Sequence, residues 1–314
     1  MGMTAVASWL SLGEGSTPLV PARALSESLG CELHLKCEGS NPTGSFKDRG
    51  MVVAVQRAAQ SGARSVVCAS TGNTAASAAA YAARAGLRAV ILTPVGATAG
   101  PKRAQARAVG ARVLEVRGTF DDALRLCREL GERDGFRVVN SLNPDRIEGQ
   151  KSVSFELIDQ LGGAPDVVAL PFGGGGNVTA VVRGFEEAGA SPRIIVGEAK
   201  ERATTWASAI RIGEPAHAER VAELVAAGRV EVVSLTEEQI RAAWERLARE
   251  EGAFCEPASA AGVAALELCV DSTLAGKVAV AILTGHGLKD ADAVPQPPDT
   301  VVEPTLEAVL EVLS

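Results

Sequence analysis

From residue 64 onward, the sequence alternates short apolar runs with segments of helical length and amphipathic pattern. The apolar runs are RSVVCAS, LRAVILTPV, ARVLEVRG, DVVALPF, PRIIVGEA and KVAVAILTG. Segments such as NTAASAAAYAARAG and NVTAVVRGFEEAG separate them. Continuous apolar strands between helices are typical of parallel sheets that helices cover on both faces. The pattern therefore predicts an α/β protein with doubly wound parallel sheets.

The same pattern favours two packed units over one very wide sheet. The strand and helix cycles divide near NSLNPDRIEGQK, where Asn143 and Pro144 supply turn chemistry. A helix is expected over TEEQIRAAWERLAREEG, because Thr236 and Gln239 have the spacing of a capping box. The Pro-rich segment 291–304 should wrap the surface before a short terminal helix, LEAVLEVLS.

The composition excludes several classes of partner. A chain of 314 residues with 46% hydrophobic content can bury a large core, and its charge of -7 argues against a nucleic-acid or acidic-membrane partner. The sequence has neither a signal-peptide pattern nor an apolar run of membrane-spanning length, so we expect a cytoplasmic protein. The six cysteines and three histidines lack metal-site spacing, and we expect no metal.

Ligands of open parallel sheets bind at the carboxyl ends of the strands, so the loops after the strands are the candidate sites. In ASTGNTAAS, four polar residues surround Gly72 at the start of a helix, where unpaired N–H groups favour an anion. These residues are Ser70, Thr71, Asn73 and Thr74. One of them would suffice as an ordinary N-cap, so the cluster indicates a ligand site.

A glycine run follows the strand DVVAL directly. The loop consists of Gly173, Gly174, Gly175, Gly176 and Asn177. Four residues without Cβ atoms let backbone N–H groups converge, which favours a phosphate, whereas a tight turn alone needs one or two glycines. The run does not match G-x-G-x-x-G. Glu198 nevertheless lies where a ribose-binding carboxylate would, which keeps a nicotinamide oxidoreductase as an alternative.

Lys47 stands in NPTGSFKDRG, where a helical pattern begins. Lysine is scarce in this chain, with seven residues against 24 arginines. A nucleophilic amine must lose its proton, which burial and nearby cations promote and which arginine cannot do. In isolation, the stretch also fits an ordinary solvated lysine at a helix start. In LTGHGLKD, Thr284 ends the last apolar strand and either points into a site or caps the strand.

Taken together, these loops resemble the fold-type II family of pyridoxal-phosphate enzymes, and within it the threonine synthases. The motifs are GEGSTPL, PTGSFKDRG, ASTGNTAASAAAYAARAG, NPDRIEGQK, EPASAAGVAAL and LTGHGLKD, in that order from about residue 11 to residue 290. The resemblance implies a homodimer whose subunits hold the cofactor in a cleft between two domains. The larger domain would comprise residues 1–46 and 139–314, and the smaller, mobile one residues 47–138.

The resemblance also implies a role for each cofactor-binding residue. Lys47 would form the Schiff base with the aldehyde of pyridoxal 5'-phosphate and then shuttle protons. Asn73 would hydrogen-bond the ring hydroxyl, and residues 173–177 would cradle the cofactor phosphate. Thr284 would face the ring nitrogen as a neutral partner. A pyridoxal cofactor needs an amine, a phosphate cradle and a ring-nitrogen partner, and the chain offers one of each.

In the threonine synthases, the substrate is O-phospho-L-homoserine, which water converts to L-threonine and phosphate. A second anion site is therefore needed beyond that of the cofactor. Ser141 and Arg146 match positions that hold the substrate phosphate, for which arginine offers bidentate contact. Ser70, Thr71 and Thr74 would grip the amino-acid end and assist with the phosphate.

One departure from the family leaves alternatives open. The threonine synthase loop usually reads like G-N-A-G-N, whereas the loop here is closer to the tetraglycine loop of serine/threonine dehydratases, and Gly174 lacks a side chain used near the substrate phosphate. A dehydratase that forms a keto acid by β-elimination is therefore the main alternative, against which LTGHGLKD and Arg146 weigh. A non-catalytic binding protein on the same scaffold is a further one, against which Lys47 weighs.

Overall fold

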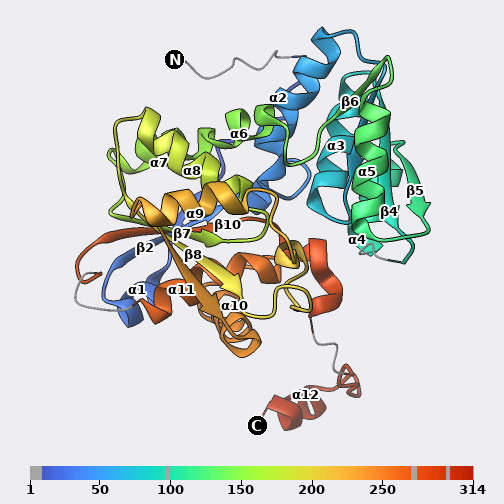
Figure 1. Ribbon diagram of the computed structural model, residues 1–314. Helices are drawn as coiled ribbons and strands as arrows, with labels where there is room; N and C mark the ends of the chain where they lie inside the picture. The colour runs from blue at the N-terminus through green and yellow to red at the C-terminus, as the bar shows by residue number, and fades with distance from the viewer. Residues whose placement is uncertain (1–8, 97–99, 270–273, 295–297, 314) are drawn as a thin grey trace.

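The computed structural model describes residues 9–96, 100–269, 274–294 and 298–313. These residues form two sheets, each in its own body of the molecule (Figure 1). The six-stranded sheet contains β1 (Leu19–Pro21), β2 (Glu32–Cys37), β7 (Val167–Pro171), β8 (Arg193–Ala199), β9 (Val230–Leu235) and β10 (Val278–Leu283). The four-stranded sheet contains β3 (Ser65–Ala69), β4 (Arg88–Pro94), β5 (Arg112–Val116) and β6 (Phe136–Val138).

The strand orders are β1-β2-β10-β7-β8-β9 and β5-β4-β3-β6. Neighbouring strands pair in parallel, except that β1 pairs antiparallel with β2 at the edge of the larger sheet. The predicted α/β fold with two doubly wound parallel sheets is therefore confirmed.

The connections between strands are helical. The α-helices are α1 (Arg23–Leu29), α2 (Lys47–Gln60), α3 (Asn73–Arg84), α4 (Gly100–Ala108), α5 (Phe120–Gly131), α6 (Pro144–Gln150), α7 (Ser152–Leu161), α8 (Gly176–Glu187), α9 (Ala218–Ala226), α10 (Glu237–Glu250), α11 (Ala260–Leu268) and α12 (Leu306–Leu313). The 3-10 helices are η1 (Glu38–Ser40), η2 (Ser208–Ile210), η3 (Pro257–Ser259) and η4 (Gly287–Ala293).

Helices cover both faces of the four-stranded sheet. Along β3, Val66 and Cys68 pack into the core formed with α2, α3 and α4. Val67 and Ala69 point the other way, into the core formed with α5. Successive side chains of a strand alternate between faces, so burial of both faces produces the continuous apolar run seen in the sequence.

The six-stranded sheet is covered in the same way. One face packs against α1, α10 and α11, and the other against α7, α8 and α9. Helix α11 lies so close to β8 that a Cβ on Gly197 would come within 2.0 Å of the Ala261 carbonyl oxygen. A glycine is therefore required at this crossing.

Helices α2 and α6 contact each other between the two bodies (Figure 1). A Cβ on Gly50 would lie 2.4 Å from the Arg146 carbonyl oxygen, and a Cβ on Gly149 would lie 2.0 Å from the Arg49 carbonyl oxygen. Only glycine permits so close a backbone approach. The crossing brings the start of α2, with Lys47, next to α6, with Arg146.

Several elements were not predicted from the sequence, among them β1, β2, α1, α6, α9 and β9. The capping box of α10 is confirmed, because Thr236 accepts from the backbone of Gln239 and the Gln239 side chain accepts from the backbone of Thr236. Among the described residues, no helix is both long and apolar enough to cross a membrane.

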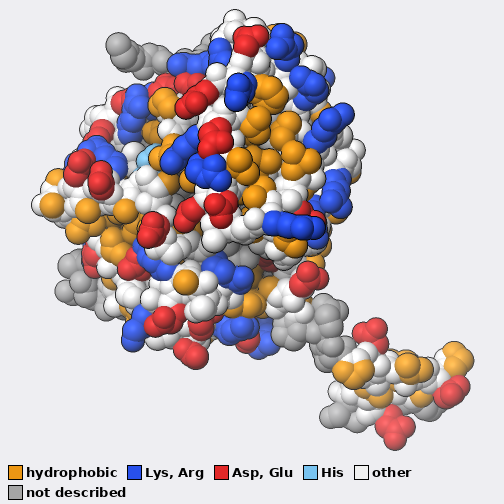
Figure 2. Space-filling model, turned by 45° about the vertical axis from the view of Figure 1, so that its right-hand side comes forward, with side chains coloured by type: hydrophobic (Ala, Val, Ile, Leu, Met, Phe, Trp, Pro, Cys, Tyr) orange, Lys and Arg blue, Asp and Glu red, His pale blue; other side chains and the backbone are white. Residues whose placement is uncertain are grey.

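The C-terminal segment differs from the prediction that residues 291–304 wrap the surface. Residues 295–297 of that segment lie outside the described residues. Helix α12 lies away from the body (Figure 1), and apolar side chains are exposed on its surface (Figure 2). Leu306 and Leu313 are 70% and 76% exposed. An eight-residue helix with few packing partners gains little stabilisation from burial, which is the main source of helix stability in proteins.

Candidate active site

Lys47 is the first residue of α2 and lies at the carboxyl edge of the six-stranded sheet. The loop before it is bound to the end of β10, since Phe46 N donates to Thr284 O at 3.0 Å and Ser45 bridges to Gly285. Two loops that lie far apart in the sequence are thereby brought together. Burial, and then the charge of the Arg146 guanidinium, lower the pKa of the Lys47 amine to about 7.

Arg146 is a buried cation with few partners. It is 1% exposed, and its Nη1 donates to Val139 O at 3.1 Å. Its Nε and Nη2 atoms are buried and find no hydrogen-bond partner among the described residues. Burial lowers the pKa of Arg146 to about 10, but the group stays charged at neutral pH. A buried guanidinium with free donors destabilises the fold unless an anion accepts its hydrogen bonds. This group therefore fits a phosphate or carboxylate ligand.

Asn73 is the first residue of α3 and is also buried. Its Nδ2 donates to both carboxylate oxygens of Glu256, at 3.0 and 2.9 Å. Its Oδ1 is buried and has no partner in the part of the chain that the structure describes. Glu256 is fully buried just before η3. Burial raises the pKa of Glu256, and the nearby Lys102 ammonium opposes that rise.

The glycine loop lies between β7 and α8. Gly175 has a φ of 83° and is the N-cap of α8. A Cβ at Gly173 would lie 3.2 Å from Ile210 Cα, and one at Gly175 would lie 3.0 Å from His217 Cβ. Asn177 follows, and its buried Nδ2 has no hydrogen-bond partner within residues 9–96, 100–269, 274–294 and 298–313. A bare backbone at the start of a 12-residue helix, with a free amide donor beside it, fits a phosphate group.

Thr284 ends β10 and is 4% exposed. Its hydroxyl lies 3.2 Å from the Ser259 hydroxyl, which in turn accepts from Gly285 N at 3.2 Å. Ser259 therefore orients the Thr284 side chain. The pair offers a neutral hydroxyl, and no charge, at this strand end.

The residues predicted to bind substrate occupy different places. Ser70 is buried in the loop between β3 and α3, and Thr74 is buried in the first turn of α3, whereas Thr71 is partly exposed. The Ser141 carbonyl lies beside the glycine loop, because it is 3.0 Å from His217 Nε2 while His217 N donates to Gly174 O. Within the described part of the chain, no hydrogen bond joins the Thr71 or Ser141 side chain to Lys47, Arg146 or Asn73.

Sequence reasoning missed the charged residues that surround Asn73. Lys102 Nζ donates to Asp290 Oδ1 at 2.8 Å and to Ser208 Oγ at 2.9 Å, and it lies 3.8 Å from Glu256 Oε2. Lys289 Nζ donates to Thr43 O at 2.7 Å. The scarcity of lysine was a usable signal, since four of the seven are buried. These are Lys36, Lys102, Lys151 and Lys289.

Glu198, the carboxylate behind the nicotinamide alternative, pairs with Arg202. The Arg202 guanidinium stacks on the Phe172 ring, 4.3 Å from its centroid. Glu198 is therefore part of an ion pair at the rim of the glycine loop. All six cysteines are free thiols, and among the described residues no three His, Cys, Asp or Glu side chains gather as a metal site would require.

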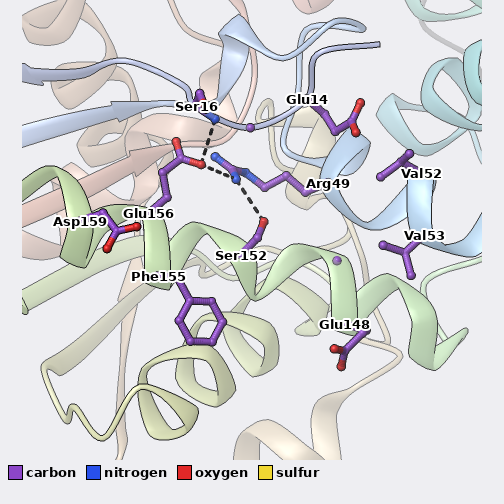
Figure 3. A pocket seen from close by; sticks show the side chains of 12 residues that line it. Glu14, Ser16, Arg49, Val52, Val53, Glu148, Ser152, Phe155, Glu156 and Asp159 are labelled. Carbon is purple, nitrogen blue, oxygen red and sulfur yellow. Dashed lines mark hydrogen bonds and ion pairs between the residues drawn. The ribbon is translucent and has the colours of Figure 1, made fainter. Parts of the chain in front are cut away.

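A cavity of about 340 Å³ lies between α2, α7 and the loop at residues 14–16 (Figure 3). Its walls include Glu14, Arg49, Phe155, Glu156 and Asp159, but none of the residues predicted for the site. Figure 3 shows Arg49 reaching across to Ser152 and Glu156. Residues two apart on a helix point in different directions, so the Arg49 and Lys47 side chains lie on different sides of α2.

Comparison with known proteins identifies the family of this chain. Residues 10–285 match the family described as "Pyridoxal-phosphate dependent enzyme". The threonine synthase of Halalkalibacterium halodurans is 47% identical over 300 residues, covering 90% of this chain and 84% of that protein. The threonine synthase of Synechocystis sp. is 44% identical over 325 residues, covering 97% and 85%.

Solved structures show the same fold. Cysteine synthase from Entamoeba histolytica superposes with a TM-score of 0.81 at 21% identity, covering 95% of this chain and 93% of that one. Threonine deaminase isoform 2 from Solanum lycopersicum gives a TM-score of 0.76 at 26% identity, covering 86% and 79%. By its sequence and its fold, the chain belongs to the family of pyridoxal-phosphate dependent enzymes and, within that family, to the threonine synthases.

Proposed function

We propose that the protein is a threonine synthase, a carbon–oxygen lyase of threonine biosynthesis that converts O-phospho-L-homoserine and water to L-threonine and phosphate. The observation that carries the proposal is the Arg146 guanidinium, buried beside Lys47 with two free donors. A phosphorylated substrate needs such a group in addition to the glycine loop. The threonine synthases that match most of the chain support the same reaction.

The residues of the cleft fit pyridoxal 5'-phosphate as the cofactor. Two buried polar atoms, Asn73 Oδ1 and Asn177 Nδ2, have no partner among the residues that the structure describes, although buried polar groups are normally hydrogen-bonded. We assign the cofactor to Lys47, Asn73, residues 173–177 and Thr284. When bound, the cofactor supplies an electron sink for the substrate carbons. Lys47 would hold it covalently through Nζ.

Lys47 is also the catalytic residue of the proposal. With a pKa of about 7, its amine is neutral in a large fraction of molecules at physiological pH and can take and return protons. The Arg146 charge helps to keep the amine in that form. Thr284, whose hydroxyl contacts that of Ser259, would present a neutral hydroxyl to the ring nitrogen and would leave that nitrogen largely unprotonated.

We assign substrate binding to five of the residues predicted from the sequence. Ser70, Thr71 and Thr74 would bind the amino-acid end, and Ser141 and Arg146 the phosphate. Arg146 is only 1% exposed, so a substrate reaches its free donors only when the cleft opens. We therefore propose that residues 47–138 form the smaller, mobile domain, and that residues 1–46 and 139–314 form the larger one.

A dehydratase acting on serine or threonine is the second candidate, and the glycine loop favours it. Gly174 has no side chain where the threonine synthases use one. A Cβ there would meet only Ile212 Cδ1, at 3.6 Å, so its absence is not forced by packing. We further propose that the protein is a homodimer, as the family resemblance implies, and that it is cytoplasmic.

The test is an absorption spectrum followed by a phosphate-release assay with phosphohomoserine. We expect a visible chromophore that disappears in Lys47→Ala and persists in Lys277→Ala, a matched change at an exposed lysine. We also expect phosphate and threonine to be released in equal amounts. If the chromophore is present but only serine or threonine is consumed, with keto-acid formation, the dehydratase replaces the present proposal.

A further inference from the structure

The carboxylate of Glu256 has no role in the function proposed above. It is fully buried, and both of its oxygens accept from Asn73 Nδ2, at 3.0 and 2.9 Å. Asn73 begins α3, which covers the four-stranded sheet, whereas Glu256 precedes η3, which packs on β7 of the six-stranded sheet. The pair therefore joins the two bodies at the cleft.

The carboxylate determines how the Asn73 amide is turned. An ionised carboxylate only accepts hydrogen bonds, so the NH2 group of the amide must face it. The amide oxygen then points to the other side, where Asn73 Oδ1 is buried without a partner. In this arrangement the amide offers an acceptor to whatever occupies the cleft.

The position of the carboxylate is built into the backbone. Glu256 N donates to Gly285 O at 2.9 Å. A Cβ on residue 285 would lie 2.4 Å from Glu256 Oε1, so only glycine leaves room for the carboxylate at the end of β10. Thr284 precedes Gly285 at the same strand end. The carboxylate therefore lies at the edge of the sheet where the ligand is proposed to bind.

Charged and titratable groups surround Glu256 on every side. Lys102 Nζ, from α4, lies 3.8 Å away and is shared with Asp290 and Ser208. Lys47 of α2, Lys289 and Asp290 of η4, and the Cys255 thiol also act on the carboxylate or feel its charge. The lysines favour its ionised form, while burial opposes that form.

We propose that Glu256 is a positioning residue that, through Asn73, selects the protonation state in which the cofactor ring oxygen is bound. With Glu256 ionised, Asn73 Oδ1 accepts a hydrogen bond from the ring hydroxyl. With Glu256 protonated, Glu256 donates to Oδ1, the amide turns over, and its NH2 donates to a ring oxyanion. One proton is thus held by either Glu256 or the ring oxygen. This inference rests on the proposed role of Asn73 toward pyridoxal phosphate.

The experiment is a pH titration of the visible absorbance of the holoenzyme. Glu256→Gln removes the charge and frees the amide to donate, so we expect the spectral midpoint to fall by about one pH unit. The matched control is Glu267→Gln on α11, where the carboxylate pairs with Arg246 and does not contact Asn73. An unchanged midpoint in Glu256→Gln overturns the inference.

A second comparison separates the amide from a through-space charge effect. In an Asn73→Leu background, Glu256→Gln should no longer move the midpoint by more than a few tenths of a unit, because the link is gone. A full shift in that background overturns the inference. If Glu256→Gln does not fold, the same titration is carried out on Lys102→Met. Loss of this cation favours protonated Glu256 and should therefore lower the midpoint, whereas a rise or no change counts against the proposal.

Phosphate release from phosphohomoserine is measured on the same preparations. Its absence, with the predicted spectral shifts present, overturns the proposed reaction and leaves the role of Glu256 standing. Normal phosphate release with an unchanged midpoint in Glu256→Gln supports the proposed reaction and overturns the role of Glu256. A protein without any absorption band that depends on Lys47 overturns both.

Discussion

Two buried polar clusters flank the first turns of α2, and they differ in how completely their atoms are paired. We call the first the closed network; it consists of Lys36, Glu38, Arg49 and Glu156. We call the second the open cluster; it consists of Lys47, Asn73, Arg146 and Glu256. Both lie beside the contact between α2 and α6, so burial alone does not distinguish them.

The two arginines make the difference plain. Arg49 Nε and Nη2 donate to the Glu38 carboxylate at 2.6 and 2.7 Å, Nη1 donates to Glu156 at 2.8 Å, and the remaining donors reach Ser152 and Thr17. All five N–H groups of that guanidinium are used. Arg146 makes one described hydrogen bond and leaves Nε and Nη2 free. A saturated guanidinium stabilises the fold, and an unsaturated one is available to a ligand.

The largest expected effect comes from breaking the closed network. Arg49→Met would leave Glu38 buried with its main partner lost, and we expect the free energy of unfolding to fall by about 3–5 kcal/mol. Chemical denaturation of the holoenzyme measures it. The matched change Arg146→Met should alter stability by less than about 1 kcal/mol, since few bonds are lost. Equal losses in the two variants would remove the distinction between the clusters.

Activity should respond in the opposite sense. Arg146→Met removes a charged donor for the substrate phosphate, and we expect kcat/KM for phosphohomoserine to fall about 10²–10³-fold, as for other lost oxyanion donors. Cofactor occupancy, followed by visible absorbance, should stay within about twofold of the wild type. A variant that loses cofactor and activity together would instead place Arg146 at the cofactor phosphate.

Acid should weaken the closed network first. Burial by itself would raise the pKa of Glu156. The contacts with Arg49 and Lys36 outweigh burial and lower this pKa to about 2 from an ordinary value of 4.5. A lowered folded-state pKa gives stability that is present above pH 4.5 and is lost as the pH falls toward 2. We expect Glu156→Gln to be less stable by about 3 kcal/mol at pH 7 and to lose less on acidification. Parallel denaturation curves at pH 7 and pH 3 check this, and an equal acid loss in both proteins contradicts it.

The smallest effects distinguish neighbouring glycines of the phosphate loop. Gly175→Ala places a side chain at a φ of 83° against His217 and should cost about 1–2 kcal/mol together with some cofactor affinity. Gly174→Ala has room and should stay within about 0.5 kcal/mol of the wild type. Thermal unfolding of both variants measures the difference. Gly174→Asn should lower KM for phosphohomoserine if the threonine synthase assignment holds, and leave it unchanged if it does not.

Much of the fold follows from local pattern. Strands such as β3 and β7 are buried on both faces, which makes nearly every residue apolar and the strand easy to recognise. Strand β2 was missed because ELHLKC mixes polar and apolar residues: Lys36 is buried in the closed network, and Glu32 is exposed. Helix α12 was predicted correctly as a helix, but its place away from the body depends on packing partners that no local pattern describes.

The parts of the site that the sequence determined are those that one loop carries by itself. Four consecutive glycines predict bare backbone, and the scarce Lys47 and the strand-end Thr284 stand out from their own surroundings. Only the tertiary structure decided that Glu256 meets Asn73, 183 residues away, and that Arg49 is saturated while Arg146 is not. The reason is physical. Residue type sets what a side chain can donate or accept, but whether its partners are present depends on which distant segments the two sheets and the contact between α2 and α6 bring within 3 Å of one another.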